Sequence, residues 1–170
     1  MEVELELEAS KPKIHTRDFF FEAGEILLQI AKRNKVPLLV ATVTIDDFEK
    51  LHNEYEAKVV DDIFQFVIQK IQNKCRTSDI IANMGNGEIG LIFYNTTNVN
   101  SKLVFETIRA KIEENIYMFN EEIKVNLTVS IGGVVMHNLV SARTIDALYD
   151  QSKIALDTVQ RKGKNGILVY

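Results

Sequence analysis

The stretch that decides the fold is Asp79–Tyr94, which reads DIIANMGNGEIGLIFY. It holds two short apolar runs, residues 79–84 and 88–94, separated by Gly85-Asn86-Gly87. Asn-Gly is the strongest short-range hairpin signal, because both residues tolerate positive φ. The sequence therefore predicts two antiparallel strands joined by a tight turn.

The segments on either side of this hairpin alternate between helix and strand patterns. Apolar residues recur at helical spacing in four segments, residues 17–32, 57–74, 101–116 and 144–161. The β-branched run 36–45 predicts a strand buried on both faces, and strict alternation over 123–131 predicts a strand with one apolar face. A last short strand is predicted at 167–170, and the polar stretch 46–55 is assigned no regular element. This order predicts an α/β domain of the α+β sandwich type, with a mainly antiparallel central sheet flanked by helices.

Composition narrows the class of protein further. The 170 residues are 46% apolar and carry a formal net charge of -4, which argues against binding a nucleic-acid polymer but allows a local basic pocket for one nucleotide. A single cysteine, Cys75, excludes an internal disulfide and predicts a cytoplasmic location. No apolar run is long enough to span a membrane. Residues 1–13 alternate glutamate with apolar residues and end near a proline, so we interpret them as a linker or the end of an upstream segment, and residues 14–170 as the domain.

Five short segments, in this order and spacing, resemble the signatures of the GGDEF (diguanylate cyclase) domain family, over roughly residues 15–170. They are VTIDDF at 43–48, RTSD at 76–79, GNGEI at 85–89, TVSIG at 128–132 and GKN at 163–165. The resemblance implies the nucleotidyl cyclase palm fold and a bacterial protein of cyclic di-GMP signalling. It also implies an upstream sensor or receiver domain and a homodimer as partners.

The family joins two GTP molecules, one on each of two facing domains, and holds each with divalent metal, usually Mg²⁺, on carboxylates. The resemblance puts Thr44 and Gly87 at two of the metal carboxylate positions, so both carboxylates are lost. Glu88 survives as the only catalytic remnant, and Ile45 still offers a backbone carbonyl. The implied metal site is thereby incomplete, and Mg²⁺ is expected only with residual GTP binding.

Two nearby aspartates leave an alternative open. Asp46 and Asp47 together with Glu88 would form a rearranged metal site that rescues activity. We favour instead that Asp46 and Asp47 cap the next helix through its backbone N–H groups.

The nucleotide-binding positions of the family are partly kept. His52 and Asp61 stand at the guanine-reading positions, where the family has asparagine and aspartate, and histidine still donates and accepts hydrogen bonds. Gly85, Asn86 and Gly87 form the hairpin under the nucleotide, with Asn86 replacing a glycine that leaves room for it. The phosphate-contacting lysine of the family appears as Gln160, and the following arginine as Lys164.

Arg76 and Asp79 match the family's inhibitory RxxD site, where the product cyclic di-GMP binds. An arginine fork grips phosphate or guanine, and a carboxylate accepts from guanine N–H groups. The alternative is that Arg76 caps the end of the second helix and Asp79 begins a strand. A second arginine often completes this site; Thr107 stands at its position, with Arg109 nearby on a different face.

Four functions follow from these residues. The first is a catalytically inactive signalling domain with a regulatory, protein-interaction or nucleotide-sensing role. The others are a cyclic di-GMP receptor acting through the RxxD site, a residual diguanylate cyclase, and a dimerisation scaffold.

Overall fold

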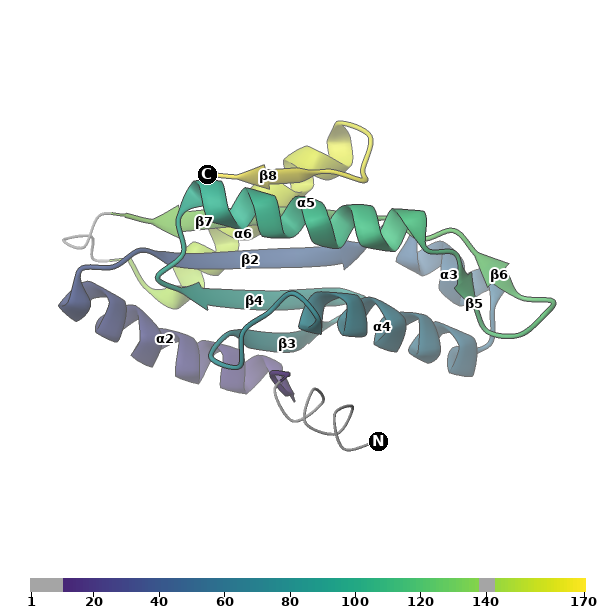
Figure 1. Ribbon diagram of the computed structural model, residues 1–170, viewed down its shortest axis with the longest axis horizontal. Coiled ribbons are helices and arrows are strands. Elements are labelled where there is room, and N and C mark those ends of the chain that lie inside the picture. The colour runs from purple at the N-terminus through teal and green to yellow at the C-terminus, as the bar shows by residue number, and fades with distance from the viewer. Residues whose placement is uncertain (1–10, 138–142) are drawn as a thin grey trace.

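A computed structural model describes residues 11–137 and 143–170 (Figure 1). The helices are α2 (Arg17–Asn34), α3 (Phe48–Glu54), α4 (Ala57–Gln72), α5 (Asn98–Glu114) and α6 (Ile145–Arg161). The strands are β1 (Ile14–His15), β2 (Leu38–Ile45), β3 (Ile80–Gly85), β4 (Glu88–Tyr94), β5 (Tyr117–Met118), β6 (Lys124–Val125), β7 (Val129–Met136) and β8 (Ile167–Val169). No helix in the described part of the chain is both long and apolar enough to cross a bilayer.

Six strands form the central sheet, in the order β1-β3-β4-β2-β7-β8. The three inner pairings, β3–β4, β4–β2 and β2–β7, are antiparallel, and the two edge pairings are parallel. All eight residues of β2 and of β7 are buried, as expected for central strands covered on both faces. The predicted mixed α/β fold, with helices on a mainly antiparallel sheet, is confirmed.

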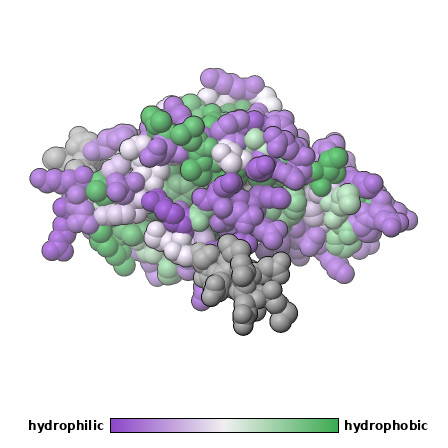
Figure 2. Space-filling view, in the orientation of Figure 1, coloured by the Kyte–Doolittle hydropathy of each residue, from purple (hydrophilic) through white to green (hydrophobic). Residues whose placement is uncertain are grey.

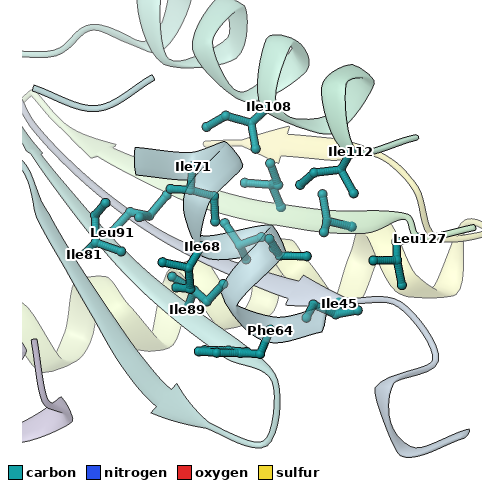
Figure 3. Close-up of a cluster of buried hydrophobic side chains, with 14 of the residues drawn as sticks. Ile45, Phe64, Ile68, Ile71, Ile81, Ile89, Leu91, Ile108, Ile112 and Leu127 are labelled. Carbon is teal, nitrogen blue, oxygen red and sulfur yellow. The ribbon is translucent and has the colours of Figure 1, made fainter. Parts of the chain in front are cut away.

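Two separate cores lie on opposite faces of the sheet. On one face, α4 and α5 pack their isoleucine-rich stripes onto alternate residues of the strands. Figure 3 shows side chains of this cluster from α4, α5 and the strands, among them Ile71, Ile112 and Leu91. On the other face, α2 and α6 enclose the second core, around Phe20. The sheet is therefore buried on both faces, between one pair of helices on each side.

The sequence-based boundaries needed four corrections. The predicted strand at 123–131 is wrong as one element. Its first part belongs to the small β5–β6 hairpin, and residues 126–128 lie outside any strand. The central strand β7 begins at Val129 and continues to Met136. Helix α3 lies in the stretch that was assigned no element, and β1 was missed. Helix α5 begins at Asn98 rather than 101, because Thr97 accepts a hydrogen bond from Asn100 N as an N-cap. Most of the predicted linker, residues 1–10, lies outside the described residues.

Helix α6 approaches β7 more closely than side chains would normally allow. A Cβ placed on Gly132 would lie 2.1 Å from Leu156 N and 2.4 Å from Ser152 O, both backbone atoms of α6. At the same place the Thr42 and Ser152 hydroxyls share a buried hydrogen bond of 2.8 Å. The glycine in TVSIG is therefore required for helix–sheet contact.

Gly132→Ala is expected to destabilise the fold by at least about 3 kcal/mol, because neither backbone atom of α6 can move without shifting the helix. The free energy of unfolding from urea titration measures this. The neighbouring Gly133→Ala is the matched control, since its Cβ would meet only side chains at 3.4 Å or more. Equal effects of the two substitutions would contradict the close contact.

Candidate functional site

The candidate site forms where β2 ends and the chain turns into α3. Here the carboxylate of Asp46 is buried and accepts three hydrogen bonds. The donors are Thr128 Oγ1 at 2.7 Å, Ser130 Oγ at 2.6 Å and the backbone N of Asn165 at 2.9 Å. Asp46 thus ties the end of β2 to β7 and to the loop after α6.

That loop is fixed a second time, through the side chain of Asn165. Its Oδ1 accepts from Arg109 Nη1 at 2.8 Å, and its Nδ2 donates to Glu113 Oε1 at 2.8 Å. Arg109 also pairs with Glu106 and Glu113 along α5, and its hydrogen bonds to both carboxylates raise the pKa of Arg109. Both partners of Asn165 lie on α5, so α5 and the β2 end position the GKN loop together.

The β3–β4 hairpin has a two-residue turn that contacts the end of β2, where Ile45 N donates to Gly87 O at 3.3 Å. Asn86 and Gly87 both have positive φ, 52° and 74°, the geometry of a type I′ turn, so the predicted hairpin is confirmed. The ring of Phe48, the first residue of α3, lies against Gly87, so that a Cβ there would be 2.5 Å from it. Phe48 occupies the space that a side chain at position 87 would need.

The carboxylates around the turn are paired with lysines. Glu88 accepts a hydrogen bond from Lys153 of α6, and Asp47 accepts one from Lys164 of the GKN loop. The Asp47 carboxylate raises the pKa of Lys164. The expected capping of α3 by Asp46 and Asp47 is wrong: Asp47 is the N-cap residue but makes no side-chain cap hydrogen bond, and Asp46 turns to the sheet instead.

A cleft of about 450 Å³ opens between the end of β2, α3 and the GKN loop. This is large enough for a nucleotide-sized ligand. Its lining residues are Thr44, Ile45, Asp47, Phe48, Glu49, Lys50, Asn53, Gln160 and Lys164.

The structure brings only some of the predicted nucleotide-binding residues to this cleft. Lys164 and Ile45 line it, but the hairpin residues 85–88 do not. His52 is also absent from the lining, because its ring packs edge-on against Phe48 with 4.8 Å between centroids, and the neighbouring Asn53 faces the cleft instead. Asp61 is exposed on α4 and does not line the cleft either.

Arg76 and Asp79 meet at the start of β3, on the loop after α4. The Asp79 side chain is only 3% exposed, and its Oδ2 accepts from Arg76 N at 2.7 Å. Its Oδ1 lies 3.4 Å from Arg76 Nη2 and has no hydrogen-bond partner among the described residues. Burial therefore raises the pKa of Asp79, against the lowering effect of the hydrogen bond from Arg76 N.

Arg76 does not cap the second predicted helix, so that part of the alternative is wrong, whereas Asp79 directly precedes β3 as the alternative expected. Helix α4 ends at Gln72, and Arg76 Nη2 donates instead to Tyr94 O at 3.1 Å and Thr96 Oγ1 at 3.0 Å. The Arg76 side chain is nevertheless 58% exposed. Thr107 bonds to Leu103 O within α5, and Arg109 is held by the GKN loop, so neither is directed to Arg76 by these contacts.

Comparison with known families decides the identity of the domain. The sequence profile of the family described as "Diguanylate cyclase, GGDEF domain" matches residues 11–166. The chain belongs to the GGDEF family. Among curated relatives, it is 28% identical over 158 residues to the probable diguanylate cyclase DgcT of Escherichia coli K12, covering 92% of this chain and 34% of that protein. The diguanylate cyclase DosC of the same strain is 22% identical over 140 residues, covering 82% of this chain and 30% of DosC. The chain thus spans about a third of the length of these relatives.

Solved GGDEF domains share this fold. The active GGEEF domain of a diguanylate cyclase from Vibrio cholerae superposes with a TM-score of 0.84 at 20% identity, covering 93% of this chain and 98% of that one. The GGDEF domain of DgcB from Caulobacter crescentus, solved in complex with c-di-GMP, gives 0.86 at 17% identity, covering 93% and 89%. The cyclase palm architecture is therefore shown.

The donor set at the site does not fit a magnesium ion. Mg²⁺ requires several hard oxygen ligands in octahedral arrangement. Asp46 accepts hydrogen bonds from three donors within the chain, and Asp47 and Glu88 are each paired with a lysine. Gly87 of the hairpin turn has no side chain to offer as a ligand. Among residues 11–137 and 143–170, no three His, Cys, Asp or Glu side chains are grouped so that they would hold a metal.

Restoring the signature carboxylate by Gly87→Asp is expected to destabilise the fold by about 2 kcal/mol, because Phe48 fills the space and the backbone has positive φ. Thermal or urea unfolding measures the loss. Adding Mg²⁺ is expected to leave the unfolding midpoint of the variant unchanged.

Gly85→Asp is the matched control for this substitution. Its φ is also positive, at 92°, but nothing lies within 4 Å of its Cβ, so only the backbone cost of about 1 kcal/mol remains. A Gly87→Asp variant as stable as Gly85→Asp, or one stabilised by Mg²⁺, would show that Phe48 moves aside and a metal site forms.

Proposed function

We propose that this chain is a catalytically silent GGDEF domain that serves cyclic di-GMP signalling by regulation, protein interaction or nucleotide sensing. The observation that carries the proposal is that the three carboxylates nearest the lost metal positions, Asp46, Asp47 and Glu88, are all paired within the chain. Asp46 is saturated by Thr128, Ser130 and Asn165, Asp47 is bonded to Lys164, and Glu88 to Lys153. Phosphoryl transfer in this family depends on metal-held charge compensation, and these residues supply no such metal cage.

The proposal includes the setting of the domain. Residues 14–170 form the domain, and residues 1–13 link it to an upstream sensor or receiver domain of a longer protein. The single, partly buried Cys75 fits a reducing cytoplasm. The cleft by Lys164 is where GTP, with Mg²⁺ if any, would be held without turnover.

An assay of the purified chain with GTP and Mg²⁺ or Mn²⁺ is expected to yield no cyclic di-GMP, by chromatography of the nucleotides. The active GGEEF domain from Vibrio cholerae, run at equal concentration, is the positive control. Product formation that disappears in Glu88→Gln would overturn the proposal and establish a residual cyclase, whereas product that persists in that variant would indicate a contaminating enzyme.

A second candidate function is that of a cyclic di-GMP receptor through Arg76 and Asp79. The supporting observation is a buried Asp79 oxygen without a hydrogen-bond donor beside an arginine that is more than half exposed. A buried unpaired carboxylate oxygen is costly, so its presence calls for a physical explanation, and a bound donor would supply one. An approaching guanine would supply the missing N–H donor, provided that the loop opens around Asp79.

Calorimetric titration with cyclic di-GMP tests this candidate. We expect micromolar binding that weakens at least tenfold in Arg76→Ala, because the phosphate or guanine contact is lost. Arg161→Ala, at an arginine on α6 whose side chain is 79% exposed, is the control and should bind normally. Absence of heat, with no shift in melting temperature, would remove the receptor function and leave protein interaction or scaffolding. Since Arg76 also bonds to Tyr94 and Thr96, the variant's melting temperature is measured alongside.

A further inference from the structure

The outer face of α2 carries apolar side chains that remain partly or largely exposed, although the ring of Phe19 stacks on His15 with 3.9 Å between centroids. Phe19, Ile26 and Ile30 are 40%, 63% and 40% exposed, whereas Phe20 and Leu28 on the opposite side are fully buried against the sheet. Spacings of seven and four residues place the three exposed side chains on one stripe of the helix. Figure 2 shows apolar surface over the position that α2 occupies in Figure 1.

Two opposite charges flank the Ile26–Ile30 part of this stripe, and Phe19 lies one turn further toward the N-terminus. Glu22 lies one turn before Ile26, and Arg33 lies about one turn after Ile30, both exposed. Neither is in an ion pair among the described residues. From Glu22 to Arg33 the helix face therefore reads acidic, apolar, apolar, basic. The two charges lie at similar distances on either side of the Ile26–Ile30 pair and have opposite signs.

We propose that this stripe is the contact surface for a second copy of this chain, with the two α2 helices antiparallel about a two-fold axis. In that arrangement Ile26 packs on Ile30 of the second copy, and Glu22 pairs with Arg33 of the second copy. The two-fold axis repeats both contacts. A parallel pairing would set Glu22 against Glu22 and Arg33 against Arg33, so charge repulsion selects the antiparallel one.

This association is independent of the proposed function. None of the stripe residues lines the cleft at Lys164, and none contacts Arg76 or Asp79. The surface would let a silent domain dimerise with its nucleotide cleft open.

The size of the contact sets its strength. An α2 of 18 residues is about 27 Å long, and one helix pair buries less than the roughly 1,600 Å² of a standard interface. We therefore expect a dimer with a dissociation constant in the micromolar range that weakens as salt screens the flanking charges.

Sedimentation equilibrium of the whole chain over a wide concentration range tests the proposal. The wild type is expected to shift from monomer to dimer, and Ile26→Glu to remain monomeric. Leu103→Glu is the matched control, because Leu103 is equally exposed, at 65%, but lies on α5. A wild type that stays monomeric into the millimolar range, or an Ile26→Glu variant that dimerises like the wild type, would overturn the proposal.

Charge reversal tests the antiparallel register. Glu22→Arg and Arg33→Glu are each expected to weaken dimerisation about tenfold, because each creates two like-charge contacts per dimer. The double variant restores opposite charges in an antiparallel pair and should dimerise like the wild type. A double variant no stronger than the single ones would exclude this pairing. Circular dichroism melting checks that every variant is folded, as expected for exposed positions.

Discussion

The buried carboxylate of Asp46 is the interaction on which the shape of the candidate site depends. A charge removed from water is costly unless its oxygens are hydrogen-bonded, and here two hydroxyls of the β7 region and the backbone N of Asn165 satisfy it. These donors come from segments 82 to 119 residues away in sequence. The contact therefore forms only when β2, β7 and the GKN loop are all in place.

This arrangement explains how the fold persists without carboxylates at Thr44 and Gly87. The contacts that hold the domain together are the two cores, the close approach of α6 to Gly132, and the Asp46 and Asn165 hydrogen bonds. The positions where the family carries metal carboxylates, Thr44 and Gly87, take no part in these contacts beyond the strand pairing and the turn. A carboxylate at either position would carry a charge that a bound metal would balance. Its absence therefore does not lower the stability of the domain without metal.

The sequence predicted the fold well wherever the signal was local. The Asn86-Gly87 turn and the apolar run of β2 were predicted correctly. Positive backbone φ and burial on both faces of a sheet each restrict which residue types occur. The start of β7 was misplaced because the alternation in 123–131 continues into a small hairpin, and only pairing with β2 shows where the central strand begins.

Site residues were less predictable, since their roles depend on distant partners. Asp46 and Asp47 have the side chains of helix-capping residues, and nothing local to them reveals the hydroxyls at 128 and 130 or the lysine at 164. His52 was placed at a guanine-reading position by its motif, yet its ring is packed on Phe48. The structural role of Asn165 had a sequence signal in the GKN motif, but its partners on α5 had none.

The two lysines at the site, Lys153 and Lys164, affect how a phosphate-bearing ligand would bind there. A half-empty metal site with unpaired carboxylates would repel a nucleoside triphosphate until a cation arrived. Here Lys153 and Lys164 already balance Glu88 and Asp47, so these two carboxylates are paired before any ligand arrives. A triphosphate that recruited Lys164 would have to release Asp47 into the same cleft, facing its own phosphates. The exchange gains one ion pair and loses another, so binding energy at this cleft must come chiefly from the base. The resemblance to the family assigns base recognition to His52 and Asp61, and both residues lie outside the cleft lining.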